Sequence, residues 1–146
     1  ISNDALTTAK ENAFINGFEK KIEFVQADVF DYLPQVESLK PAPYDFIILD
    51  PPAFTKSRKT ALDAVRGYTE INSRAMKALP RGGYLATCSC SHFMEEKMFV
   101  KMLKNASEYA GVSLRLIKAC AQSPDHPELM SVPETKYLKF YLLQIT

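Results

Sequence analysis

The sequence has no long apolar run, few cysteines and little net charge. None of its apolar stretches approaches the roughly 20 residues of a membrane-spanning helix, and its start lacks the basic stretch and apolar core of a signal peptide. Its 146 residues include 3 cysteines, an odd number that argues against a disulfide framework. These absences favour one globular domain in a reducing, cytoplasmic setting, with no membrane partner.

Charge and histidine content also restrict the functional classes. A formal net charge of +1 does not by itself indicate a nucleic-acid binder, but "TKSRKT" gathers Lys56, Arg58 and Lys59 in one short segment. A solvated surface loop would explain such a run, and a contact with RNA phosphates is the functional alternative. The 2 histidines, His92 and His126, have no regular ligand spacing with the cysteines, so no metal site is predicted.

Helical and extended patterns alternate along the chain, which is typical of an α/β sheet. We expect helices over 2–16, 29–33, 60–79 (interrupted near Gly67) and 95–110, and strands over 21–27, 44–50, 84–89, 112–120 and 137–145. The nearly continuous apolar run "YDFIILD" predicts a parallel strand buried on both faces. The last two strands have no helix between them, so we expect an antiparallel pair at one edge.

Three chemically useful side chains follow expected strands: Asp28, Asp50 and Cys90. Ligands of open α/β sheets lie beyond the carboxyl ends of the strands, so these side chains are candidates for one site. In "LDPPAF" the prolines force an extended Asp50 and a stiff loop, with Phe54 available for stacking on a planar ring. A rigid turn after a core strand is the alternative explanation of this loop.

Three segments, "DFIILDPPAFTKSR", "RGGYLATCSCSHFM" and "QSPDHPELMSVPETKYLK", carry a family resemblance. They resemble the class I S-adenosylmethionine-dependent methyltransferases of ribosomal RNA, in particular the bacterial large-subunit (cytosine-5) enzymes. The resemblance implies a Rossmann-like sheet, mostly parallel with an antiparallel edge strand, S-adenosylmethionine as cofactor and large-subunit ribosomal RNA as partner. Asp-Pro-Pro alone occurs in many amino-group methyltransferases, whereas Asp-Pro-Pro-x-Phe together with Ser-Cys-Ser is more specific.

The resemblance also assigns roles to individual residues. Asp28 matches the acid that accepts a hydrogen bond from the adenine amine of the cofactor, and the backbone of Val29 would meet the adenine ring. Asp50 matches the acid beside the cofactor that contacts the ring nitrogen and amine of cytosine, and Cys90 matches the nucleophile. Contacts with RNA are expected from Phe54, Lys56, Arg58 and Lys59.

A cysteine suits this chemistry because carbon 5 of cytosine is too weak a nucleophile to attack a methyl donor directly. Addition of the Cys90 thiolate to carbon 6 makes carbon 5 enamine-like, and Asp50 can stabilise the charge displaced into the ring. We expect Cys90 in an exposed loop, with Cys88 and Cys120 as small core residues.

The sequence departs from the family at its start, because the glycine-rich cofactor loop, the ribose-binding acid, the first two strands and the N-terminal RNA-binding domain are absent. Residues 1–146 are therefore expected to be the carboxyl-terminal part of a catalytic domain, active only within the complete protein. Residues 21–27 would pair with a preceding segment, with residues 44–50 or with a second copy of the chain in a homodimer. Two alternative functions remain: an exocyclic amine methyltransferase acting on RNA guanine, and a non-catalytic RNA-binding or assembly module.

Overall fold

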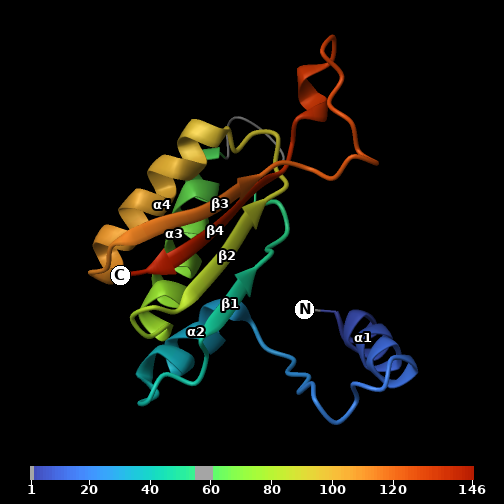
Figure 1. Ribbon diagram of the computed structural model, residues 1–146, viewed down its shortest axis with the longest axis vertical. Helices are drawn as coiled ribbons and strands as arrows, with labels where there is room; N and C mark the ends of the chain where they lie inside the picture. Colours follow the sequence, from blue (N-terminus) through green and yellow to red (C-terminus); the bar gives the residue numbers. More distant parts are fainter. Residues whose placement is uncertain (1, 55–60) are drawn as a thin grey trace. The chain divides into compact units, whose positions relative to one another are not determined.

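The computed structural model describes residues 2–54 and 61–146 (Figure 1). The chain divides into two compact units, Ile1–Tyr32 and Leu33–Thr146, and each is considered by itself. The basic segment with Lys56, Arg58 and Lys59 lies outside the described residues.

The first unit contains helix α1 (Asn3–Ile15) and the start of α2 (Val29–Ser38). The hydroxyl of Ser2 accepts a hydrogen bond from the backbone of Ala5 at 3.4 Å and caps α1. The helix ends at Asn16, which Gly17 follows with a φ of 71°. A glycine adopts this left-handed conformation without steric cost, which explains why the Asn-Gly pair ends the helix.

The strand predicted over residues 21–27 is wrong, because these residues adopt no regular structure. Two of their apolar side chains are exposed, Ile22 at 45% and Val25 at 46%. A strand is stable only when its backbone groups pair with a neighbour, and no strand in the described part of the chain pairs with this segment. Its pairing with a preceding segment or a second copy remains a prediction, whereas the predicted pairing with residues 44–50 is not formed.

The second unit is built on a four-stranded sheet of β1 (Phe46–Leu49), β2 (Tyr84–Ser89), β4 (Lys139–Ile145) and β3 (Leu114–Cys120), in that order. β1 and β2 are parallel, and β4 is antiparallel to both β2 and β3. Three strands therefore run in one direction and β4 alone is reversed. The predicted α/β fold and the antiparallel pair at one edge are confirmed, with β4 as the inner member of that pair.

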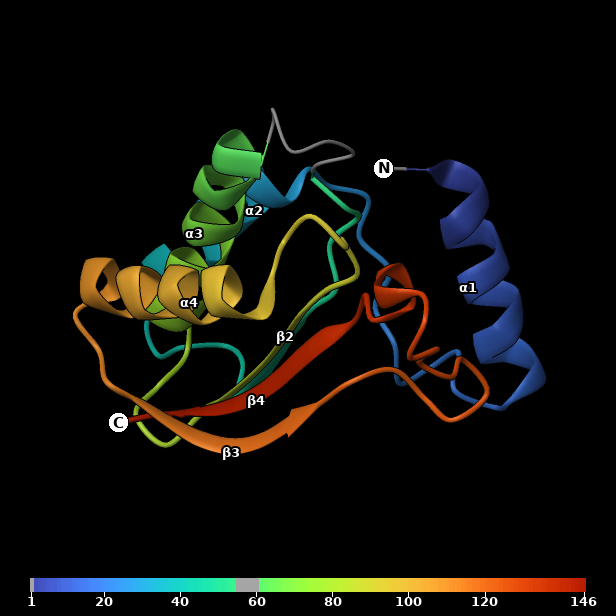
Figure 2. The same ribbon diagram turned by 90° about the horizontal axis from the view of Figure 1, so that it is seen from above.

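Helices α3 (Ala61–Ala78) and α4 (Glu96–Ala110) cover one face of the sheet (Figure 2). Their apolar sides meet the alternate residues of β4 that are buried, and the largest fully buried side chains include Tyr68, Ile71 and Phe99. Aromatic rings run from α3 through α4 to β4, with Tyr68 to Phe99 at 6.2 Å and Phe99 to Tyr141 at 5.7 Å. Burying each such ring stabilises the fold by roughly 2–3 kcal/mol, so this layer fixes α3 and α4 on the sheet.

Two expectations about the second unit are corrected. Helix α3 continues through Gly67 without an interruption, because its buried apolar face outweighs the cost of one glycine, about 1 kcal/mol. Strand β1 is not buried on both faces, since Phe46 is 49% and Ile48 is 68% exposed. Among the described residues of Leu33–Thr146, β1 pairs only with β2, and α3 and α4 cover one side of the sheet. β1 therefore contains apolar side chains that the second unit leaves exposed.

The described residues include no helix long and apolar enough to cross a membrane. They also include no group of three or more His, Cys, Asp or Glu side chains arranged to hold a metal ion.

Candidate functional site

Asp50 and Cys90 lie at the same edge of the sheet. Asp50 directly follows β1 and Cys90 directly follows β2, and these two strands are parallel neighbours with Leu49 opposite Thr87. Both side chains belong to exposed residues. Parallel strands end together, so the geometry places the carboxylate and the thiol beyond adjacent strand ends, where ligands of α/β sheets bind.

Cys88, on β2, contacts the Asp50 carboxylate. Its thiol donates to the Oδ1 atom of Asp50 at 3.1 Å and lies 3.3 Å from the carbonyl oxygen of Leu49. Burial, followed by the hydrogen bond to Asp50, raises the pKa of Cys88 to about 12. Cys88 therefore remains a neutral thiol at physiological pH, which disfavours it as a nucleophile and makes it an orienting donor for Asp50.

Cys88 is buried, as predicted, but its contact with Asp50 was not predicted. The two residues are 38 positions apart in the sequence, and only the pairing of β1 with β2 brings them together. The alternation along β2 gives a partial signal, because it places the Cys88 side chain on the opposite face from Thr87 and Ser89.

Tyr68 connects the loops that follow β1 and β2. Its hydroxyl accepts a hydrogen bond from the Ser89 hydroxyl at 3.0 Å and another from the backbone of Phe54. Its ring also packs against the ring of Phe54, with 4.6 Å between the centroids. Burial is the main cause that raises the pKa of Tyr68. This neutral, fully buried phenol holds the "DPPAF" loop against the "SCS" turn. This role of Tyr68 was not predicted from the sequence.

Asp28 and Val29 belong to the first unit, at the start of α2. The Oδ1 atom of Asp28 accepts a hydrogen bond from the backbone of Phe30 at 2.8 Å, so Asp28 caps the helix. Asp28 is exposed and Val29 is half-buried. The cap bond uses one of the two carboxylate oxygens, and the other has acceptor capacity for a ligand amine.

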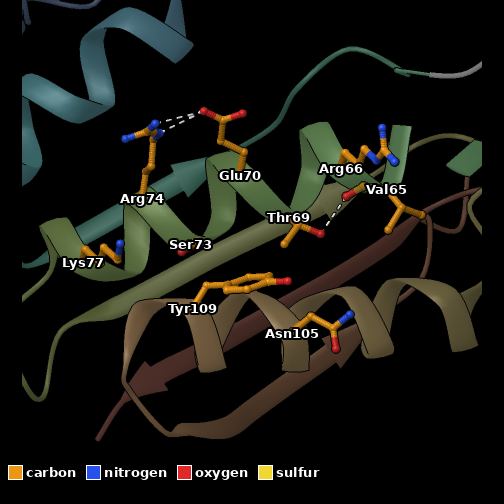
Figure 3. A pocket seen from close by; sticks show the side chains of 9 residues that line it. All are labelled: Val65, Arg66, Thr69, Glu70, Ser73, Arg74, Lys77, Asn105 and Tyr109. Carbon is orange, nitrogen blue, oxygen red and sulfur yellow. Dashed lines mark hydrogen bonds and ion pairs between the residues drawn. The ribbon is translucent and has the colours of Figure 1, made fainter. Parts of the chain in front are cut away.

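A groove of about 480 Å³ between α3 and α4 is a separate feature (Figure 3). It is lined mainly by polar side chains, including Arg66, Glu70, Arg74, Lys77, Asn105 and Tyr109. Arg74 pairs with Glu70 at 3.0 Å and with Glu37 at 3.6 Å, so much of the positive charge is neutralised. None of the predicted site residues that the structure describes lines this groove, so it is treated as separate from the candidate active site.

The role of Tyr68 can be tested by Tyr68→Phe. This change removes the oxygen that accepts the hydrogen bonds from Ser89 and Phe54, and Ser89 is 1% exposed, so its hydroxyl loses a partner that water cannot replace. We expect the free energy of unfolding to fall by about 1–2 kcal/mol, measured by urea denaturation. Tyr109→Phe, at a residue 72% exposed, is the matched control and changes it by less than about 0.5 kcal/mol. Equal stabilities of the two variants would contradict the linking role.

Comparison with known proteins places the chain in a family. The profile of the family described as "Methyltransferase domain" matches residues 1–140. The chain is 38% identical over 148 residues to ribosomal RNA large subunit methyltransferase I of Vibrio vulnificus (strain YJ016), covering 99% of this chain and 37% of that protein. It is 39% identical over 140 residues to the Aeromonas hydrophila protein of the same name, covering 95% of this chain and 35% of the relative.

Solved structures give the same fold. TrmN from Thermus thermophilus superposes with a TM-score of 0.60 at 23% identity, covering 99% of this chain and 34% of that one. SMU.776, solved in complex with SAH, superposes with a TM-score of 0.66 at 19% identity, covering 81% and 30%. The chain thus spans little more than a third of the curated relatives that it matches. It belongs to the methyltransferase domain family, with the class I α/β fold, and is related to ribosomal RNA large subunit methyltransferase I.

Proposed function

We propose that the chain is the carboxyl-terminal part of a catalytic domain that methylates carbon 5 of a cytosine in large-subunit ribosomal RNA. The cofactor is S-adenosylmethionine, and Cys90 forms a covalent bond to the base. The three cysteines are free, which suits the reducing conditions of the cytoplasm.

The observation that carries this proposal is the placement of Asp50 and Cys90 at adjacent parallel strand ends, with the Cys88 thiol hydrogen-bonded to Asp50. A planar base held against Asp50 would lie beside the turn that presents Cys90. Cys88 orients the Asp50 carboxylate. Tyr68 holds the loops that follow β1 and β2 through the hydrogen bonds that its hydroxyl accepts from Phe54 and Ser89. Such support of reactive groups by buried neighbours is what a preorganised site requires.

The side chains can perform the following chemistry. The Cys90 thiolate adds to carbon 6 of cytosine, and the electron pair of the carbon 5–carbon 6 double bond moves onto carbon 5 and the conjugated ring. Asp50 holds the ring by accepting a hydrogen bond from the amine and, when protonated, by donating one to the ring nitrogen. Carbon 5 would bond to the methyl group that S-adenosylmethionine supplies, with S-adenosylhomocysteine as the leaving group. When the proton on carbon 5 is then removed, the double bond forms again and Cys90 leaves as a thiolate.

The residues of the first unit fit the cofactor. S-adenosylmethionine, when bound, supplies an electrophilic methyl group. Asp28 would accept a hydrogen bond from the adenine amine with the carboxylate oxygen that the helix cap leaves available, and the Val29 backbone would border the ring. RNA is held by Phe54, whose ring packs against that of Tyr68, and by the cations Lys56, Arg58 and Lys59.

The test is a covalent trap with RNA that carries 5-fluorocytosine at the target position, incubated with the complete protein and S-adenosylmethionine. Fluorine cannot leave carbon 5 as a proton does, so elimination of Cys90 is blocked and the adduct persists. We expect peptide mass spectrometry to locate the RNA on Cys90, with no adduct for unmodified RNA.

An adduct on another residue, or an active enzyme that forms none, would contradict the proposal. The second outcome would favour methylation of an exocyclic amine, which requires the loop from Asp50 to Phe54 but no thiol.

A further inference from the structure

Lys139 occupies an unusual place for a lysine. It is the first residue of β4, and it shares the buried side of that strand with Tyr141, Leu143 and Ile145. Only 7% of its surface is exposed. Burying an ammonium group is costly unless polar partners compensate, so this position needs an explanation that packing alone does not supply.

The contacts of Lys139 lead to the turn that carries Cys90. Its register partner on β2 is Ser89, the residue before Cys90. Its Nζ atom donates to the carbonyl oxygen of Ser91, the residue after Cys90, at 2.6 Å, and to that of Tyr137 at 2.7 Å. Lys139 therefore spans the Ser89–Ser91 turn, and both recorded acceptors are neutral carbonyl groups.

The charged groups that act on Lys139 are Cys90, when ionised, and Glu96 on α4. Glu96 accepts a hydrogen bond from the Tyr141 hydroxyl at 3.0 Å. A cavity of about 170 Å³ beside Lys139 is also lined by Glu96, Tyr141, Cys120 and Lys136. Desolvation is the main cause that lowers the pKa of Lys139 to about 8, against the raising effect of Cys90 and Glu96. Lys139 is thus cationic at neutral pH and loses its charge as the pH rises through about 8.

We propose that Lys139 is a positioning residue that holds the Ser91 carbonyl and keeps a buried positive charge beside the Cys90 thiolate. The attraction between two charges is shared, so a thiolate that stabilises the ammonium is stabilised by it to the same extent. This inference rests on the proposed function, because the charge matters for catalysis only if Cys90 is the nucleophile. Lys139 itself does not touch the reacting atoms in this role.

The experiment measures the rate at which iodoacetamide alkylates Cys90 between pH 6 and pH 10, followed by peptide mass spectrometry of the complete protein. Lys139→Gln keeps N–H donors for the carbonyls but removes the charge, and Lys139→Met removes both. At pH 7 we expect alkylation on the order of tenfold slower in both variants, with the pH profile displaced to higher pH, because an opposite charge close by favours the thiolate. Lys139→Arg keeps the charge and stays within about threefold of wild type.

Two controls accompany the comparison of the Lys139 variants with wild type. Lys136→Met removes an exposed cation from the same cavity and leaves the Cys90 rate unchanged. Cys120 in each sample reports any general change in accessibility. Wild-type alkylation in Lys139→Gln would show that Lys139 only tethers the turn and would overturn the proposal. If Lys139→Met unfolds, as judged by circular dichroism, the comparison of Lys139→Gln with Lys139→Arg tests whether the charge of Lys139 affects Cys90.

The alkylation assay uses neither RNA nor S-adenosylmethionine, so the two proposals can fail separately. If Cys90→Ala still methylates RNA while Lys139→Gln slows alkylation, the covalent mechanism is wrong and the coupling of Lys139 with Cys90 stands. If the 5-fluorocytosine adduct forms on Cys90 while Lys139→Gln alkylates at the wild-type rate, the mechanism stands and the role of Lys139 is wrong.

Discussion

We expect methylation of large-subunit ribosomal RNA by the complete protein to fall below detection, by about 10⁴-fold or more, when Cys90 is replaced by alanine. Without the thiolate, carbon 5 of cytosine is not activated, and the Cys88 thiol, whose pKa burial raises to about 12, does not replace it. Loss of an essential nucleophile commonly costs a reaction several orders of magnitude. The measurement is transfer of a radiolabelled methyl group from S-adenosylmethionine to RNA under single-turnover conditions.

The other cysteines provide matched controls for Cys90→Ala. Cys120→Ala changes a half-buried residue at the end of the edge strand β3 and leaves the rate unchanged. Cys88→Ser keeps a hydrogen-bond donor toward Asp50 and retains most of the activity. A Cys90→Ala enzyme that methylates at a rate close to wild type would remove the covalent mechanism and favour amine methylation.

The second large effect is expected for Asp50→Asn, which slows methylation by about 10²–10⁴-fold. The amide cannot supply the negative charge or the proton that the cytosine ring requires in the transition state, and loss of one such group costs this range. Folding stays intact because Asp50 is exposed and its recorded hydrogen-bond donor is a thiol, a weak donor. The same methyl-transfer assay and a thermal unfolding curve check the two parts of this prediction.

Asp45→Asn is the control for the position in the strand, because Asp45 is an exposed acid at the opposite end of β1. It leaves both the rate and the melting temperature unchanged. An Asp50→Asn protein that does not fold would instead show that Asp50 serves a structural turn, the alternative that the sequence left open.

Local patterns predicted the elements that depend on local chemistry. The bounds of α1 and α4 were predicted to within one residue at each end, and the left-handed Gly111, with a φ of 68°, follows α4. The placement of Asp50 and Cys90 at the same edge of the sheet was also predicted from the sequence, because parallel strands end together. These features depend on a few neighbouring residues or on a general rule of α/β sheets.

The features that sequence reasoning missed depend on long-range contacts. Tyr68 meets Ser89 across 21 positions, and Lys139 meets Ser91 across 48. A helical tyrosine or a strand lysine has no local signal of such a partner, although the alternation in "YLKFYLLQI" does place Lys139 among buried residues. The wrong strand at 21–27 has the same origin, since apolar alternation predicts extended structure but cannot supply the partner that stabilises it.

The prolines after β1 have a further consequence, for solubility. In the part of Leu33–Thr146 that the structure describes, β1 has one edge without a partner strand and exposes Phe46 and Ile48, and such edges are templates for aggregation. Pro51 and Pro52 have no N–H to donate, so a foreign strand cannot extend its ladder along the chain beyond Asp50. β1 itself has only 4 residues. The rigid loop that presents Asp50 thereby also limits fibril-like growth from the open edge of the sheet.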